Sequence, residues 1–342
     1  MGIKLTDIVF RRPMVDEELR GRVVAFDTYN MLYQFLSSIR TPEGHPLSSN
    51  DGTVISHLKG LLSRTSNLVK NGIKPVMVFD GKPHELKKGT LEMRRERKER
   101  AQKEWERAVE IGDMEKARSK AMQTSHLTEE MVEQTKDLLE RMGIPIVQAP
   151  MDGEAQASFM CIRGDAHAVS SQDFDSLLFG CPLLIRYLGV TGRRKLPGRR
   201  SYKTVDPEAV PLKESLECIG VTREQLVDMA ILIGTDFNNG VKGIGPKTAQ
   251  KLIKEYGNLE TILKEKRIPL IEYEEIRNIF LDPSVTSDYS VKFGKLDDEA
   301  VKEMLVEGLG FSLEGVERNL ENMRGFQDIE NRNSQTSLDG FF

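Results

Sequence analysis

The fold is decided by two short stretches of sequence, Val23-Val24-Ala25-Phe26-Asp27 and Val76-Met77-Val78-Phe79-Asp80. Each is an apolar run, rich in valine, that ends in an aspartate, and this pattern predicts a buried β-strand followed by an acid. In a parallel sheet the carboxyl ends of the strands converge on one edge, where ligands are normally bound. The two aspartates are therefore expected to lie close together.

Short apolar runs of this kind occur at Arg22–Phe26, Pro75–Phe79, Ile144–Val147 and Leu183–Tyr187, and long helical patterns separate them. Alternation of strands and helices along a chain is typical of an α/β fold. We therefore predict a central, mostly parallel sheet flanked by helices.

Further acids occur at comparable places. Asp152-Gly153-Glu154 opens a helical pattern, Asp173-Phe174-Asp175 forms another cluster, and Asp236 follows an apolar helix predicted at Leu226–Ile233. A single aspartate at such a place is most often a helix N-cap. Seven acids at one edge are different, because two unit charges 4 Å apart repel by about 4 kcal/mol at an effective dielectric constant near 20. A group of this size needs bound cations.

Oxygen ligands alone favour Mg²⁺ or Mn²⁺. Two such ions about 4 Å apart are the standard arrangement for phosphodiester hydrolysis, since one activates water and the other stabilises the leaving oxygen. Histidine chemistry is not needed, because the histidines at positions 45, 57, 84, 126 and 167 have no spacing that fits a zinc site or a catalytic triad. The acids thus predict hydrolysis of a phosphodiester.

The composition is that of a globular protein, with 30% charged and 39% hydrophobic residues and no apolar run long enough to span a bilayer. Three scattered cysteines, Cys161, Cys181 and Cys218, form no disulfide framework or zinc cluster, which favours a reducing interior. The start at Met1-Gly2 fits a loose myristoylation pattern but lacks a polybasic neighbour. We expect no association with a membrane.

The net charge of −4 argues against a general affinity for nucleic acid. Basic residues are nevertheless concentrated between Cys181 and Val205, where no acid occurs: Arg186, Arg193, Arg194, Lys195, Arg199, Arg200 and Lys203. They are enough for several phosphate contacts, and the alternative is a solvated basic loop.

Two other segments stand out by their charge. Between Glu85 and Glu140 acids and bases are densely interleaved, which indicates exposed helix. A salt-bridged hairpin or short coiled coil is the alternative, but no a/d seam is sustained, so an insertion that projects from the sheet fits better. Asp328–Ser337 is polar and indicates a flexible tail, so the compact part is expected to end near Phe326.

A glycine-rich turn, Gly240-Val-Lys242-Gly243-Ile-Gly245-Pro246-Lys247-Thr248, precedes a helical pattern with apolar residues at positions 249, 252, 253 and 256. Pro246 interrupts the Gly-Lys-Thr order of a P-loop, so nucleotide binding is rejected. Backbone N–H groups at the helix start can receive a phosphate, and Lys242 and Lys247 would add charge. The alternative is a plain helix connection that needs glycine only for its backbone.

Together these residues resemble the flap endonucleases, a branch of the structure-specific 5′ nucleases, over nearly the whole chain. The motifs that carry the resemblance are Asn71-Gly-Ile-Lys-Pro-Val-Met-Val-Phe-Asp-Gly-Lys-Pro83, Asp173-Phe-Asp-Ser-Leu-Leu-Phe-Gly180 and Gly234-Thr-Asp-Phe-Asn238 continuing to Gly243-Ile-Gly-Pro-Lys247. The resemblance implies endonuclease activity on DNA with 5′ flaps, 5′-3′ exonuclease activity, and roles in replication and repair.

The resemblance also implies a set of site residues. Two Mg²⁺ ions, for which Mn²⁺ can substitute, would be held by Asp27, Asp80, Asp152, Glu154, Asp173, Asp175 and Asp236. Lys87 and Arg94 match residues of a helical arch that contact the scissile phosphate, and the arch would guide a single-stranded flap. Asp152 stands where the family normally has Glu, so its shorter side chain is expected to reach a metal only through water.

DNA contacts follow from the same resemblance. Tyr33 matches an aromatic residue on which a base stacks, Arg40 and Arg64 match DNA-contacting arginines, and Gly2 would lie near the active site. The turn with Lys242, Gly243, Gly245 and Lys247 is similar to the helix–two-turn–helix motif, which grips duplex DNA and binds K⁺ through backbone oxygens.

The end of the chain matches a sliding-clamp-binding motif through Gln335, Leu338, Phe341 and Phe342. Such a peptide orders on binding, and a flexible linker gives it reach. Since the sequence finishes there, it resembles the archaeal members, which implies a cytoplasmic, nucleoid-associated monomer; a eukaryotic source would imply the nucleus.

The expected organisation is a single nuclease domain over 1–326 and a tail over 327–342. Within the domain we expect an N-terminal part at 1–83, the arch at about 84–140, an internal part at about 141–260 and a C-terminal helical part to 326.

Three other functions share some of these features. A ribonuclease of the related small nuclease fold would share the acids but not the arch and glycine turn. A phosphatase with an aspartyl-phosphate needs a second Asp two residues after Asp27, where the chain has Tyr29. A non-catalytic clamp-binding adaptor would keep the acids for structure alone.

Overall fold

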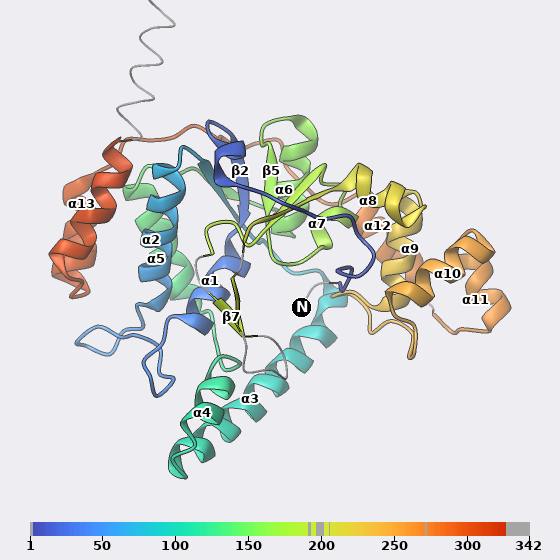
Figure 1. The fold of residues 1–342 in the computed structure, drawn as a ribbon, viewed down its shortest axis with the longest axis horizontal. Helices are drawn as coiled ribbons and strands as arrows, with labels where there is room; N and C mark the ends of the chain where they lie inside the picture. The colour runs from blue at the N-terminus through green and yellow to red at the C-terminus, as the bar shows by residue number, and fades with distance from the viewer. Residues whose placement is uncertain (1–2, 191–192, 196–201, 205, 271, 326–342) are drawn as a thin grey trace, which may run out of the picture.

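A seven-stranded sheet forms the centre of the protein, in a computed structural model that describes residues 3–190, 193–195, 202–204, 206–270 and 272–325. Five neighbouring strands are parallel and the two at one end are antiparallel (Figure 1). In spatial order the strands are β1 (Arg12–Pro13), β9 (Glu208–Pro211), β6 (Leu183–Arg186), β5 (Ala168–Ser170), β2 (Val23–Asp27), β3 (Lys74–Phe79) and β4 (Ile146–Gln148). The predicted α/β fold with a mostly parallel sheet is confirmed.

The two central strands are apolar throughout because both faces of the sheet are covered. Along β2, Val24 and Phe26 belong to one hydrophobic core, whereas Ala25 belongs to the core on the opposite face. In β3, Met77 and Phe79 likewise belong to one core, and Val76 and Val78 belong to the core on the opposite face. This alternation with a period of two explains why the decisive stretches contain no polar residue before their aspartates.

Helices cover each face of the sheet (Figure 1). One core includes residues of α1 (Thr28–Ser38), α2 (Ser56–Lys70), α5 (Glu129–Arg141), α13 (Asp298–Lys302) and the π-helix η3 (Glu303–Gly308). The other includes residues of α6 (Gly153–Arg163), α7 (Asp175–Leu178), α8 (Leu212–Ile219), α9 (Arg223–Ile233), α10 (Pro246–Tyr256), α11 (Leu259–Lys266) and α12 (Tyr273–Leu281).

All four strands predicted from apolar runs are present, with bounds shifted by one or two residues. The sequence did not predict β5, which is only three residues long but lies between β2 and β6. Nor did it predict the antiparallel strands β1 and β9 or the small hairpin of β7 (Arg193–Lys195) and β8 (Tyr202–Thr204).

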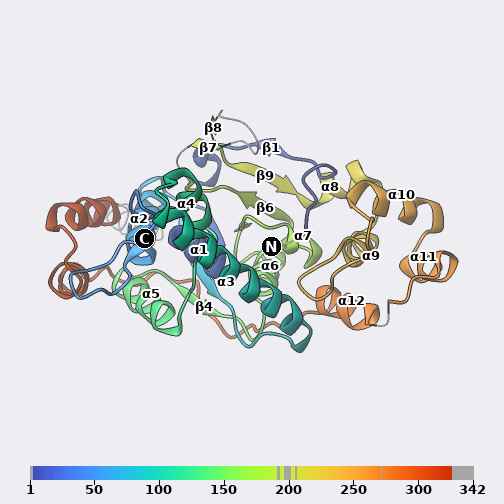
Figure 2. The ribbon, with the colours of Figure 1, turned by 90° about the horizontal axis from the view of Figure 1, so that it is seen from below.

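A helical hairpin projects from the carboxyl edge of the sheet (Figure 1). It begins with the short η2 (Glu85–Lys87) and consists of α3 (Lys88–Glu110) and α4 (Met114–Ala121), which pack against each other. Seen from below, α3 runs across the molecule from the side of α1 toward α12 (Figure 2). In contrast, α5 packs against α2, so the charged segment of the sequence contains both a projecting and a core helix.

The hairpin contacts the loop that follows α1. Trp105 of α3 donates a hydrogen bond from Nε1 to the backbone oxygen of Glu43 at 3.3 Å, and its ring meets that of His45 edge-on with 5.0 Å between centroids. Gly44 has φ +94°, and a Cβ there would lie 2.7 Å from Cβ of Ala121, so the close approach requires glycine.

No helix of the described residues is both long enough and apolar enough to traverse a bilayer.

Candidate active site

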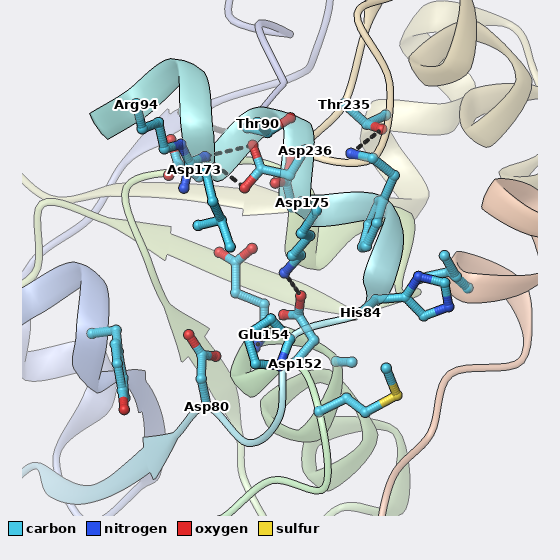
Figure 3. A pocket seen from close by; sticks show the side chains of 18 of the residues that line it. Asp80, His84, Thr90, Arg94, Asp152, Glu154, Asp173, Asp175, Thr235 and Asp236 are labelled. Carbon is cyan, nitrogen blue, oxygen red and sulfur yellow. Dashed lines mark hydrogen bonds and ion pairs between the residues drawn. The ribbon is translucent and has the colours of Figure 1, made fainter. Parts of the chain in front are cut away.

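The carboxyl edge of the sheet borders an open cavity of about 2150 Å³ beneath α3. All seven acids singled out in the sequence line it: Asp27, Asp80, Asp152, Glu154, Asp173, Asp175 and Asp236. Asp80, Asp152, Glu154, Asp173, Asp175 and Asp236 can be followed in Figure 3. The fold therefore gathers residues from across more than two hundred positions of the chain into one wall.

Backbone N–H groups orient several of these carboxylates. Asp27 is the N-cap of α1 and accepts from Asn30 N at 3.0 Å, while Asp152 caps α6. Asp80 accepts from Gly153 N at 2.6 Å. A Cβ at Gly153 would lie 2.7 Å from Oδ1 of Asp80, so this turn admits the carboxylate only beside a glycine. Asp27 and Asp152 are therefore both helix N-caps and members of the acidic site.

Two acids are more deeply placed than the others. Glu154 and Asp175 are each 9% exposed. Oε1 of Glu154 accepts a hydrogen bond from Ser171 Oγ at 2.6 Å, and Oδ1 of Asp175 accepts one from the backbone N of Ile3 at 2.9 Å. The described start of the chain therefore lies against the site.

Burial makes four of these acids hard to ionise, because too little positive charge lies near them to stabilise their carboxylates. Burial, and then the charge of Asp80, raises the pKa of Asp27 well above its ordinary value. Burial and Asp152 raise the pKa of Asp80 to about 6, and burial and the adjacent Asp173 raise the pKa of Asp175 to about 7. Glu154 shifts in the same direction, chiefly by burial. Such a cluster is stabilised by added positive charge.

Two cations from the start of the hairpin, Lys87 and Arg94, already face the acids; Arg94 is labelled in Figure 3. Lys87 forms an ion pair with Asp152, and Arg94 Nη2 lies 2.6 Å from both carboxylate oxygens of Asp236. Burial alone would lower the pKa of Lys87, but the charge of Asp152 and its hydrogen bond raise it. Both side chains that the resemblance assigns to the scissile phosphate therefore point into the cavity.

The donor set fits hard divalent cations, because it consists of carboxylate oxygens and includes buried members with raised pKa values. Within the described part of the chain, no three such side chains are close enough together to hold an ion as they stand. Two of the acids are instead bonded to Lys87 and Arg94. Their role as metal ligands stays a prediction.

The residues predicted to contact DNA differ in how they are placed. Tyr33 lines the cavity and is 38% exposed, with Lys98 Nζ 4.7 Å from its ring centroid. Arg40 is bonded within the protein to the backbone oxygens of Leu36 and Gly44, both at 2.8 Å. Arg64 points inward as well, with its guanidinium 4.5 Å from the ring centroid of Phe35.

The glycine turn connects α9 to α10, and the residues just before it, from Gly234 to Asn239, line the cavity. Gly240 has φ +66°, and a Cβ there would lie 2.3 Å from the backbone oxygen of Ile233, so glycine is obligatory. Gly245 is the N-cap of α10, and Gly243 has open space around it. Lys242 and Lys247 are exposed, so the turn presents charge and backbone to solvent.

Part of the predicted interface lies outside the described residues: Gly2, Gln335, Leu338, Phe341 and Phe342, together with Arg199 and Arg200 of the basic segment. One member of that segment is placed differently from the expectation. Arg186 is 8% exposed, donates to the backbone oxygen of Gln172 and lies 3.5 Å from Glu208, so it is a buried structural arginine and not a phosphate contact.

Two polar residues at the site were missed by the sequence reasoning. Ser171 is 4% exposed and donates to Glu154, and Asn30 donates from Nδ2 to Oδ2 of Asp173 at 3.2 Å. Asn30 lies three residues after Asp27, at the helix position whose N–H the cap accepts, and that spacing was the available signal.

Family models match most of the chain. The XPG N-terminal domain matches residues 1–101, the XPG I-region matches residues 143–236, and the C-terminal SAM fold of 5′-3′ exonucleases matches residues 221–301. A parallel sheet with acids at its carboxyl edge, followed by the α9–α10 turn, thus defines a nuclease of the XPG class.

Individual relatives narrow this class. The chain is 48% identical over 351 residues to flap endonuclease 1 of Aeropyrum pernix, and 46% identical over 342 residues to that of Methanosarcina barkeri; each alignment covers all of both chains. The solved structure of flap endonuclease-1 from Methanococcus jannaschii has a TM-score of 0.77 and 38% identity, covering 96% of this chain and all of the other. The chain belongs to the flap endonuclease family, in its archaeal type, and is a structure-specific nuclease.

Proposed function

We propose that the chain cuts DNA at the base of 5′ flaps by two-metal hydrolysis, with Mg²⁺ as the metal and Mn²⁺ as a substitute. Exonuclease action from a 5′ end, removal of primers during replication and a role in repair belong to the same proposal. The observation that carries it is the set of buried carboxylates in one cavity, facing Lys87 and Arg94. A non-catalytic adaptor gives no reason to gather acids that repel one another. A ribonuclease of the small nuclease fold would share the acids but not the projecting hairpin.

The acids have two parts in this proposal. Asp27, Asp80, Glu154 and Asp175 would hold the ions that act on the reacting phosphate. Asp152, Asp173 and Asp236 complete the ligand set, and Asp152 acts through water. When bound, the two ions supply an activated water and neutralise the leaving oxygen.

Lys87 and Arg94 exchange partners during the reaction cycle. In the structure they neutralise Asp152 and Asp236. If bound ions neutralised these acids, both cations would be free to donate to the scissile phosphate, the guanidinium in a bidentate geometry and the ammonium as a point charge. After the exchange, the negative phosphate balances the positive charge of Lys87 and Arg94. The hairpin that carries them is thereby drawn to the substrate.

The metal requirement is tested with one labelled DNA in flap, gapped and blunt forms. We expect cleavage at the flap base with Mg²⁺ or Mn²⁺, slower cleavage of the other two forms, and none in EDTA. Calorimetry of the free protein should detect uptake of two ions. Undiminished cleavage in EDTA, or equal rates on all three DNA forms, would contradict the proposal.

Duplex recognition is assigned to the α9–α10 turn and to residues beside the cavity. Lys242, Lys247 and the N–H groups of Gly243 and Gly245 would hold phosphates, and backbone oxygens of the turn would bind K⁺. Tyr33 offers a stacking surface, and Gly2, Arg40 and Arg64 are kept as candidates for DNA contact. For Arg40 and Arg64 such contact requires that the side chain leave its present partners.

The C-terminal residues Gln335, Leu338, Phe341 and Phe342 are proposed to bind a sliding clamp, because their spacing provides one polar and three apolar anchors. Deleting residues 335–342 should abolish stimulation by the clamp and leave cleavage in its absence unchanged. Steady-state rates with and without the clamp measure both effects. A fall in the unstimulated rate would show that the segment serves the active site as well.

The remaining proposals concern organisation. We propose a monomer with one nuclease domain over 1–326 and a tail over 327–342, located in the cytoplasm with the nucleoid. The arch proper is assigned to the projecting helices α3 and α4, since α5 is part of the core.

A further inference from the structure

A chain of hydrogen bonds leads from α2 through α1 to the wall of acids. Nη1 of Arg64 donates to Oε1 of Gln34 at 3.1 Å, and Nε2 of Gln34 donates to Oδ1 of Asn30 at 2.8 Å. Nδ2 of Asn30 then donates to Oδ2 of Asp173 at 3.2 Å. Asn30 and Gln34 are four residues apart in one helix, so they lie on the same side of it.

The chemistry of the two ends determines the direction of this chain. A guanidinium can only donate hydrogen bonds, and an ionised carboxylate can only accept them. Arg64 therefore selects the amide oxygen of Gln34, which turns the NH₂ group of Gln34 toward the oxygen of Asn30. The NH₂ group of Asn30 is left for Asp173. All three hydrogen bonds therefore run in the same donor-to-acceptor direction, from Arg64 to Asp173.

Asn30 is well placed to act on two acids at once. Its side chain donates to Asp173 while its backbone N donates to Oδ1 of Asp27 at 3.0 Å. Its anchor is also constrained, because the guanidinium of Arg64 packs over Phe35 and bonds to Gln34. A rigid chain of this kind limits the positions that the carboxylate of Asp173 can take.

We propose that Asn30 is a positioning residue for the metal-binding acids, and that Gln34 and Arg64 set the orientation of its amide. The proposal rests on the proposed function, in which Asp173 ligates metal. Partners that orient metal ligands typically contribute 10–100-fold to metal affinity or activity. In this role Arg64 supports the reaction from inside the protein, through its bond to Gln34.

The direction of the chain gives the sharpest test. Gln34→Glu still accepts from Arg64 but offers Asn30 a second acceptor, so the Asn30 amide must turn and present its oxygen to Asp173. Gln34→Met removes both hydrogen bonds but leaves the Asn30 amide free to keep facing Asp173. We expect Gln34→Glu to weaken Mn²⁺ binding about 10–100-fold, measured by calorimetry without DNA, and Gln34→Met to weaken it less.

Two further variants complete the design. Asn30→Leu keeps the volume but has no donor, and should match the loss in Gln34→Glu. Asn67→Asp places a negative charge on an exposed position of α2, three residues after Arg64, and should bind Mn²⁺ as the unmodified protein does. Cleavage by Gln34→Glu should recover when Mn²⁺ is raised, since only the affinity is lost, and its melting temperature should stay unchanged.

Equal losses in Gln34→Glu and Gln34→Met would overturn the proposal, as would a loss that high Mn²⁺ does not repair. If the unmodified protein took up no Mn²⁺ at all, the two-metal function itself would fall. If it took up Mn²⁺ and Gln34→Glu bound the ion equally well, only the positioning role would fall.

Discussion

Asp175→Ala is expected to lower the single-turnover rate of flap cleavage by at least about 1000-fold in Mg²⁺, since losing about 4 kcal/mol of charge stabilisation has that effect. Asp175 is 9% exposed, and its carboxylate is held by the backbone N of Ile3 at 2.9 Å. Quenched-flow cleavage of a labelled flap measures the rate.

The matched control is Asp137→Ala, which removes an acid that pairs with Arg141 on the surface of α5 and should leave the rate unchanged. Misfolding is excluded by melting the metal-free protein. The folded pKa of Asp175, about 7, lies above its ordinary value of 3.8, so this acid destabilises the fold as pH rises from about 4 through 7. Asp175→Ala should therefore remain folded at pH 8. Cleavage within tenfold of the unmodified rate would remove Asp175 from the mechanism.

Lys87→Ala is expected to lower the same rate by about 100–1000-fold, the usual effect of losing one donor to a charge that develops in the transition state. The ammonium of Lys87 is already inside the cavity, paired with Asp152. Binding of flap DNA in Ca²⁺ should change much less, because the predicted duplex contacts lie in the α9–α10 turn. Parallel measurement of the dissociation constant and the cleavage rate separates the two effects.

The neighbouring Lys88 is the control for Lys87. It points to solvent and pairs with Glu85 at the surface, with 71% of its side chain exposed. Lys88→Ala removes the same charge from the same turn and should cleave at nearly the unmodified rate. Equal losses in the two variants would mean that the segment acts through general electrostatic attraction.

The central strands of the sheet were predictable because their sequences are continuously apolar. The runs before Asp27 and Asp80 are buried on both faces, so every residue in them is apolar. Ala168–Ser170 was not predictable, because three residues carry no periodicity, and its pairing with β2 and β6 supplies what its composition lacks. The antiparallel β9 is specified by its partners in the same way.

The site was predictable in its acids and much less in their surroundings. An acid after an apolar strand is visible in the sequence, but the pairing of Lys87 with Asp152 depends on where a hairpin tens of residues away in the chain docks. Arg186 shows the same limit. The basic residues that follow from position 193 suggested a phosphate contact, but its partners are the backbone oxygen of Gln172 and Glu208 of β9. Asn30 carried a weak local signal, but its bond to Asp173 spans 143 positions.

The chain contains a single tryptophan, Trp105, and the fold places it where the α3–α4 hairpin meets the loop after α1. The tryptophan fluorescence of the protein therefore reports on this one contact between the hairpin and the loop. A hairpin that swings away from this loop would give the indole to water and move the emission to longer wavelengths, whereas a hairpin that stays docked would leave the spectrum unchanged. Trp105 is thus an intrinsic fluorescence probe of hairpin movement, which needs no dye and no engineered cysteine.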